Sequence, residues 1–194
     1  MNPEKDTKQK IIDTAFELFT SSSYDKVSIE EIIKNVGVSK GGLFHYFKSK
    51  YDLAIATTLN KTEELWMQPL LEIKRITDPY KRIKKFIDSS IDILFRNKKF
   101  TKFLLDIYEE SIKRGDDAKL WMQYFYQYTK IMTKMFEDCK IPNPEFKAMI
   151  LFSSLDAVGL EAVYFPDMEK SLDPNIIKGE FYEIFVGNYL KRKK

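Results

Sequence analysis

The sequence predicts an all-α protein, built from a small helical head and a larger helical part. Apolar residues recur at spacings of three and four, which is the period of amphipathic helices. Glycine and proline are scarce, at seven each, and alternating runs typical of half-buried strands are hard to find. With 44% hydrophobic and 31% charged residues, the 194-residue chain should form a packed core.

Composition excludes several classes of protein. The net charge of +3 is too small to indicate nucleic-acid binding by itself, so the positions of the charges must decide that question. The single cysteine, Cys139, excludes an intrachain disulfide and a cysteine-based metal cluster. The first ten residues are polar, and no run approaches the roughly 18 apolar residues of a membrane helix. We therefore expect a cytoplasmic protein with no membrane partner, no metal and no cofactor.

The first helix of the head is predicted from about Asp6 to Ser22. Its apolar stripe consists of Ile11, Ile12, Ala15, Phe16 and Phe19. A second helix should begin after Ser28, because this serine and Glu31 have the spacing of a capping box. Gly37 is expected to end it, since glycine tolerates the left-handed backbone of a tight exit.

The third helix of the head has an unusual first turn. Ser39 is its expected N-cap, and Gly41 and Gly42 follow, although each glycine costs about 1 kcal/mol relative to alanine in a helix. A helix end that must let another backbone come close would tolerate this cost, and so would a frayed helix start that needs glycine for turning. Residues 34–50 hold four lysines and no carboxylate, which favours contact with phosphates.

The motifs S-I-E-E-I, V-G-V-S-K-G-G-L-F-H-Y-F and K-S-K-Y-D-L carry a resemblance to a known family. In this order and spacing, residues 7–53 resemble the helix-turn-helix domain of the tetracycline-repressor (TetR/AcrR-type) family of transcriptional regulators. The resemblance covers about a quarter of the chain. It implies a head at residues 1–50 that binds DNA, and an effector-binding and dimerisation part at residues 51–194.

The resemblance also implies which residues face DNA. The expected set is Ser28, Ser39, Lys40, Gly41, Phe44, His45, Tyr46 and Lys50. Lys50 would anchor a phosphate at the start of the fourth helix. Two positions depart from the family pattern, because Phe44 replaces the usual tyrosine and Gly42 replaces a larger residue. His45 is the only histidine and has no partner motif for catalysis, so no catalytic residue is predicted and the protein is not expected to be an enzyme.

Six further helices are predicted after the head. They cover about Ser49–Arg75, a stretch from near Pro79, Lys99–Arg114, Asp116–Asp138, Asn143–Phe165 and Pro174–Tyr189. Pro69 lies inside the first of these and should kink or end it, because proline lacks an amide hydrogen and clashes with the preceding turn.

Aromatic residues are dense in the larger part, above all between Asp116 and Asp138. Ordinary core packing explains most of them, but Tyr and Met side chains also suit a pocket for an apolar or aromatic effector. The candidate effector-binding residues are Trp66, Phe103, Trp121, Tyr124, Phe125 and Tyr128.

The helix over Asn143–Phe165 is apolar nearly all round, with only Lys147, Asp156 and Glu161 charged between Phe146 and Phe165. Such a helix should be covered on both sides, by its own core and by a partner. Together with the last helix it is the predicted dimer interface, and the resemblance implies the same pairing. The predicted interface residues are Ser153, Ala157, Leu160, Phe181, Ile184 and Phe185.

These observations predict a ligand-responsive transcriptional regulator, most often a repressor, that binds a near-palindromic operator in double-stranded DNA as a homodimer. A small, largely apolar or aromatic effector would release it. The alternative is a helical ligand-binding or protein-interaction module without sequence-specific DNA binding, in which the glycine-rich head is only structural.

Overall fold

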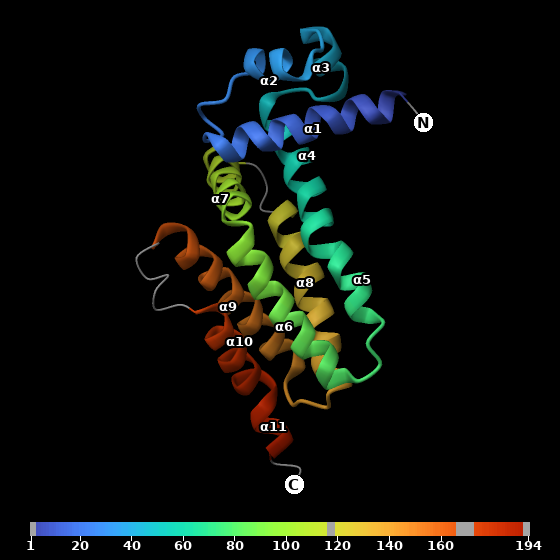
Figure 1. The fold of residues 1–194 in the computed structure, drawn as a ribbon, viewed down its shortest axis with the longest axis vertical. Coiled ribbons are helices and arrows are strands. Elements are labelled where there is room, and N and C mark those ends of the chain that lie inside the picture. Colours follow the sequence, from blue (N-terminus) through green and yellow to red (C-terminus); the bar gives the residue numbers. More distant parts are fainter. Residues whose placement is uncertain (1–2, 116–118, 166–172, 192–194) are drawn as a thin grey trace.

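The computed structural model describes residues 3–115, 119–165 and 173–191, and these residues contain helices and no strand, as predicted (Figure 1). The helices of the first part are α1 (Pro3–Ser21), α2 (Ile29–Val36), α3 (Lys40–Tyr46), α4 (Lys50–Thr62), the π-helical turn η1 (Glu63–Met67) and α5 (Gln68–Lys74). The others are α6 (Pro79–Arg96), α7 (Lys98–Lys113), α8 (Lys119–Asp138), α9 (Pro144–Tyr164), α10 (Pro174–Tyr182), η3 (Glu183–Gly187) and α11 (Asn188–Lys191). Counted as continuous stretches, the described helices number nine.

The predicted turn chemistry positions the three helices of the head. The Ser28 hydroxyl accepts a hydrogen bond from the Glu31 amide at 3.1 Å and caps α2. Gly37 ends α2 with a φ of 79°, a left-handed conformation that favours glycine. The Ser39 hydroxyl accepts from the Gly42 amide at 3.0 Å and caps α3. The head therefore sits at one end of the molecule with α2 and α3 outermost (Figure 1).

The core of the head includes side chains from well outside the first 50 residues. Phe19 of α1 stacks on Phe103 of α7, with ring centroids 5.3 Å apart and planes 10° apart. Phe100 and Ile107, also of α7, are buried in the same cluster, and so is Leu53 of α4. The head is consequently packed onto α7 rather than joined to the rest of the chain by a linker.

The helix that leaves the head does not end at Pro69. From α4 the backbone passes through η1, a five-residue π-helical segment that ends at Met67, two residues before Pro69. It then continues as α5. A wider turn at this point gives the ring of Pro69, which has no amide hydrogen to donate, more room than a regular α-turn. The helical stretch ends at Lys74, next to the predicted Arg75, and Pro69 does not end it. The chain thus runs without a break from the head to the far end of the core (Figure 1).

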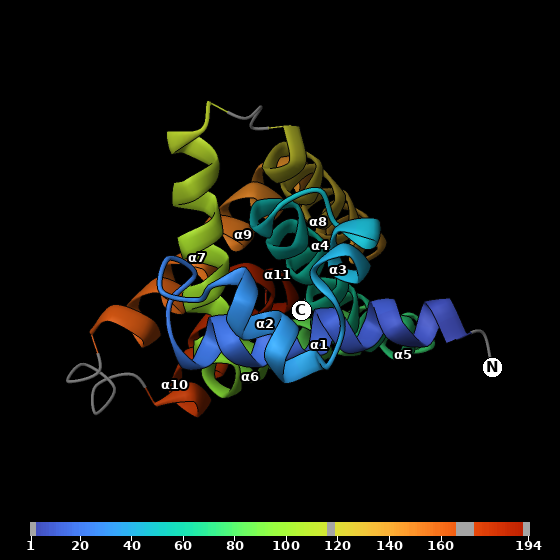
Figure 2. The same ribbon diagram turned by 90° about the horizontal axis from the view of Figure 1, so that it is seen from above.

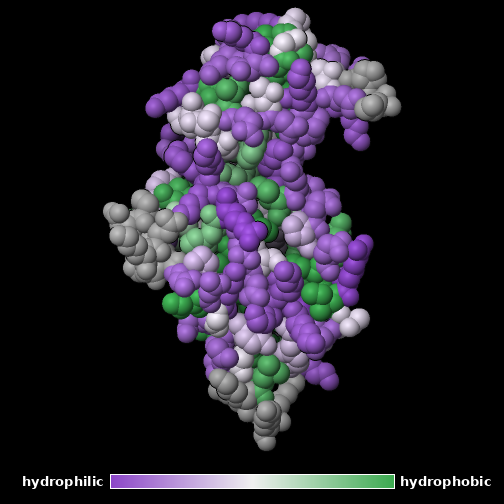
Figure 3. Space-filling model, in the orientation of Figure 1, coloured by the Kyte–Doolittle hydropathy of each residue, from purple (hydrophilic) through white to green (hydrophobic). Residues whose placement is uncertain are grey.

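A second core fills the larger part, where α6, α8 and α9 pack together and α10 lies against α6 (Figure 2). Its buried side chains include Ile87, Phe136, Leu151 and Phe185. On the face seen in Figure 3, hydrophilic side chains cover most of the head, and hydrophobic residues reach the surface in separate patches below it.

The described residues lack both a membrane-spanning helix and a cluster of metal-binding side chains. None of the helices in that part of the chain is long and apolar enough to cross a membrane. Histidine, cysteine, aspartate and glutamate side chains within it do not gather in a group of three or more that could hold a metal ion.

We predict that Phe103→Ala destabilises the protein by about 3–5 kcal/mol, because it removes a ring that is 1% exposed and leaves a cavity beneath the head. Urea unfolding followed by circular dichroism measures the change. Ile112→Ala, at a 61% exposed apolar position on the same helix, is the matched control and should shift the free energy of unfolding by less than about 0.5 kcal/mol. Equal effects of the two substitutions would contradict the proposed joint.

Candidate nucleic-acid interface and core cavity

The outer surface of α3 presents the residues that the resemblance assigned to DNA. Lys40, Gly41 and His45 are exposed, and Phe44 is 39% exposed although its side chain is large and apolar. Tyr46 is half-buried, and its ring contacts the His45 imidazole edge-on at 5.0 Å. The structure thus brings a cation, two aromatic rings and an imidazole onto one short helix. This helix lies at one end of the molecule (Figure 1).

Gly41 has no structural role that requires glycine within the described fold. A Cβ atom at this position would meet no protein atom within 4 Å, and the backbone is not left-handed. Gly42 is tighter, since a Cβ there would lie 3.2 Å from the Ser39 hydroxyl oxygen. Glycine at position 41 therefore weakens α3 without relieving a clash inside the protein.

The two capping serines use their hydroxyl oxygens inside the head. Both Ser28 and Ser39 are exposed, but each oxygen already accepts an amide hydrogen of the helix that it caps. Their hydroxyl hydrogens can still be donated to an external acceptor such as a phosphate oxygen.

The four lysines of residues 34–50 have a carboxylate near them in the folded protein, although none lies within that stretch of sequence. The Lys40 ammonium lies 3.0 Å from a carboxylate oxygen of Glu30 on α2, outside residues 34–50. This hydrogen bond and the charge of Lys40 lower the pKa of Glu30. Because both side chains are well exposed, the pair contributes little to stability and can exchange for a phosphate contact.

Lys50, which was expected to anchor a phosphate, has partners within the protein at the start of α4. Its ammonium donates to the backbone carbonyl oxygens of Tyr24 at 3.0 Å and Val27 at 3.1 Å. It also lies 4.2 Å from the centre of the Tyr24 ring. In this arrangement Lys50 fastens the loop between α1 and α2 to α4, and a phosphate would have to compete with two carbonyl groups.

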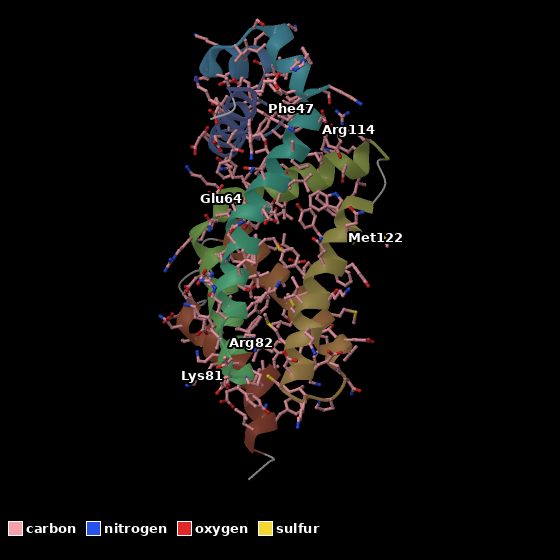
Figure 4. The ribbon with its side chains drawn as sticks, turned by 90° about the vertical axis from the view of Figure 1, so that its right-hand side faces the viewer. Phe47, Glu64, Lys81, Arg82, Arg114 and Met122 are labelled. Carbon is pink, nitrogen blue, oxygen red and sulfur yellow. The ribbon has the colours of Figure 1, made fainter. Side chains whose placement is uncertain are left out.

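The head is also tied to the last turn of α7. Arg114 stacks its guanidinium 4.6 Å from the Tyr51 ring centre, at the start of α4. Figure 4 shows Arg114 just below the head that contains Phe47, while Met122 points away from α8 into solvent.

A cavity of about 480 Å³ opens between η1, α6, α7, α8 and α9. It contains five of the six predicted effector residues, namely Trp66, Trp121, Tyr124, Phe125 and Tyr128. Phe103 is not among its walls, because its ring is buried against Phe19 in the head. A second hollow of about 640 Å³ adjoins this cavity and shares Thr62 and Tyr124 with it.

Sequence reasoning did not select Asp156 as a cavity residue. This aspartate lines the cavity and keeps contact with solvent, yet the protein atoms around it raise its pKa to about 6 by desolvation. Burial also raises the pKa of Tyr124 and of Tyr128. The available signal was a carboxylate in the middle of a helix that carries few charges.

The predicted interface residues divide into two groups. Ser153, Ala157, Leu160 and Ile184 are exposed, and Phe181 is half-buried. Phe185 is only 5% exposed, because it packs on Phe136 and Phe181 inside the single chain, so it has almost no surface to offer a partner. Exposed apolar residues that the prediction did not include extend the same helices, namely Phe146, Met149, Ile150, Tyr164 and Ile176.

Comparison with known proteins identifies the head. Residues 11–57 match the family model described as bacterial regulatory proteins of the tetR family. Over these residues the chain is similar to the tetR family of regulatory proteins. The matched segment begins in α1 and ends in α4, so it contains all of α2 and α3.

Related sequences extend the similarity beyond the head. The chain is 28% identical over 138 residues to the uncharacterized HTH-type transcriptional regulator YerO of Bacillus subtilis. The aligned segment makes up 68% of this chain but only 44% of YerO, so the chain spans less than half the length of that relative. It is 26% identical over 152 residues to an HTH-type transcriptional regulator of Staphylococcus aureus strain USA300, with 78% of each chain covered.

Solved structures share the fold. A TetR transcription regulator from Haloarcula marismortui superposes with a TM-score of 0.82 at 16% identity, over 93% of this chain and 97% of that chain. The transcriptional regulator FadR from Bacillus subtilis, solved in complex with stearoyl-CoA, superposes with a TM-score of 0.70 at 18% identity, over 92% of this chain and 97% of that chain.

We predict that Lys50→Met lowers the free energy of unfolding by about 1–3 kcal/mol, because the carbonyl oxygens of Tyr24 and Val27 lose their charged hydrogen-bond donor. Chemical denaturation measures the loss. Lys48→Met, at an exposed position two residues earlier, is the control and should change stability by less than about 0.5 kcal/mol. If Lys50→Met left stability unchanged and weakened only DNA binding, its phosphate role would be restored and its structural role would be wrong.

Proposed function

We propose that the protein is a ligand-responsive transcriptional regulator, acting as a repressor, that binds near-palindromic operator DNA as a homodimer. The observation that carries the proposal is the exposed first turn of α3, where a Cβ atom added to Gly41 would meet no other protein atom within 4 Å. A glycine that weakens its own helix and relieves no internal clash is best explained by the close approach of something outside the protein.

The chemistry of α3 suits the major groove. Lys40 can exchange Glu30 for a phosphate, and the exposed His45 imidazole can bond to base edges. The exposed ring of Phe44 offers apolar contact to a thymine methyl group. With a dimer, two such helices would enter successive major grooves about 34–36 Å apart.

The exposed apolar face of α9 and of the continuous helix α10–η3 supports the homodimer. Leu160 and Ile184 are 40% and 57% exposed in the single chain, and further exposed apolar residues continue this face along both helices. An exposed apolar surface of this kind indicates an interaction site. A second copy of the chain would cover it by placing the same two helices against each other.

The cavity supports a small-molecule effector. Its volume of about 480 Å³ falls in the range of ligand pockets, and aromatic side chains form much of its wall. The solved complex of FadR with stearoyl-CoA, a protein of the same fold, adds to this support.

Phe100 lies between the proposed effector cavity and the core of the head. Its ring is buried in the core of the head, 6.0 Å from the ring of Phe16, and it also lines the cavity. A ligand that pushes on Phe100 and on Trp66 of η1 acts on both connections between the cavity and the head. Release from DNA follows if the ligand binds better to a head arrangement that does not fit the operator.

The alternative remains a helical ligand-binding or protein-interaction module without sequence-specific DNA binding. It differs from the proposed function in its response to salt. Binding through phosphates weakens steeply as salt rises, whereas a module without a DNA site would not be retained on duplex DNA at moderate salt.

We predict that Gly41→Ala stabilises the head by up to about 1 kcal/mol yet weakens DNA binding at least tenfold, because the new methyl group blocks the backbone approach. Affinity is measured by fluorescence anisotropy on a duplex selected from a random pool by the wild-type protein. Ser21→Ala, at an exposed position at the end of α1, is the control and should leave that affinity unchanged. An unchanged affinity of Gly41→Ala would remove α3 from the DNA interface.

We also predict that Ile184→Glu converts the dimer to a monomer at micromolar concentration, because it places a carboxylate in the apolar interface. Sedimentation velocity measures the mass. Ile112→Glu, at a similarly exposed apolar position on α7, should leave the dimer intact. A wild-type protein that sediments as a monomer would overturn the proposed pairing.

A further inference from the structure

The charges around the cavity all have the same sign. Asp156 is the charged residue among the described residues that line the cavity, and Glu63 is its counterpart in the adjoining hollow. Lysine, arginine and histidine are missing from both sets of described lining residues. Asp156 forms no ion pair with another side chain in the described part of the chain, and its raised pKa has desolvation as the cause.

The rings beside Asp156 form the other half of the site. Trp66 and Tyr128 meet edge to face at 6.2 Å, and Tyr124 stacks on Tyr128 at 6.3 Å. Phe152, one turn before Asp156 on α9, lies against Phe125 and Tyr128. The faces of such rings are electron-rich and attract cations, most strongly where water is excluded.

Tyr128, which lines the same cavity, has a buried hydroxyl group without a hydrogen-bond partner among the described residues. The residue is 8% exposed, and its phenol oxygen has no hydrogen-bond partner among the described residues. Buried polar atoms are rarely left unpaired, so this oxygen points to a ligand that brings a polar or charged group into the cavity.

We propose that the effector is a hydrophobic organic cation, held by the aromatic rings of the cavity and by the carboxylate of Asp156. This inference rests on the proposed function and names the chemical class of its ligand. The rings supply the apolar contact and the cation–π attraction, while Asp156 balances the charge.

An anionic amphiphile fits the cavity poorly. A carboxylate or phosphate group would lose its water shell beside Asp156 and find no lining cation in exchange. This chain therefore differs in ligand class from FadR, which was solved with stearoyl-CoA, although the two share a fold.

The direct test compares tetraphenylphosphonium with tetraphenylborate, two ions of the same shape and opposite charge. Binding to the full-length dimer is measured by isothermal titration calorimetry and by quenching of the tryptophan fluorescence of Trp66 and Trp121. We expect tetraphenylphosphonium to bind at least tenfold more tightly than tetraphenylborate. Equal binding, tighter binding of the borate, or no binding of the phosphonium would each overturn the proposal.

Substitution of the carboxylate identifies its role. Asp156→Asn should weaken tetraphenylphosphonium roughly tenfold, since it removes a partly desolvated opposite charge, and should leave or improve tetraphenylborate binding. Glu161→Gln, which removes a carboxylate on the same helix outside the cavity, is the matched control and should change neither affinity. If Asp156→Asn binds the phosphonium as well as the wild type, the assignment of Asp156 is wrong. Should the variant fail to fold, the comparison of the two ions on the wild-type protein still decides the ligand class.

The outcome is separable from the proposed function. Preference for the borate overturns the ligand class and leaves DNA binding by α3 untouched. A protein that binds tetraphenylphosphonium but is not retained on any duplex overturns the regulator and leaves the ligand class standing.

Discussion

The stacking of Phe19 on Phe103 is the contact on which the rest of the arrangement depends. A unit as small as the three helices of the head has little apolar surface to bury by itself, and here α7 supplies one wall of its core. Lys50 and Arg114 add polar fastenings on either side of this joint, one to the loop before α2 and one to the start of α4. The orientation of α3 is thus set by a helix that lies about 60 residues further along the chain.

The same helix forms part of the cavity wall. Phe100 belongs to the core of the head and also lines the cavity, so a single side chain is shared by the two. The uninterrupted run through α4, η1 and α5 provides a second rigid connection. Close-packed interiors transmit displacement, and this is the physical basis of the proposed coupling between cavity and head.

Much of the fold could be predicted because its signals are local. The 3.6-residue period located the helices, and Ser28, Gly37 and Ser39 placed the caps of the head. The errors concern contacts between residues far apart in the sequence. Nothing near Lys50 indicates that its ammonium bonds to carbonyl groups more than 20 residues earlier, and a count over residues 34–50 cannot include Glu30. Likewise, the aromatic pattern does not tell which core receives Phe103 or Phe185, since both rings are apolar and both cores are helical. The π-helical turn before Pro69 was also missed, because a single sequence shows the proline but not how the helix accommodates it.

Native-state hydrogen exchange tests most directly whether the head and α7 form one cooperative body. If they do, buried amides of the head such as those of Ile11 and Ile32 should open with the same free energy and denaturant dependence as the amide of Phe103. A head whose amides exchange at a clearly lower free energy than those of α7 would show that it opens alone, and the coupling through the joint would then be contradicted.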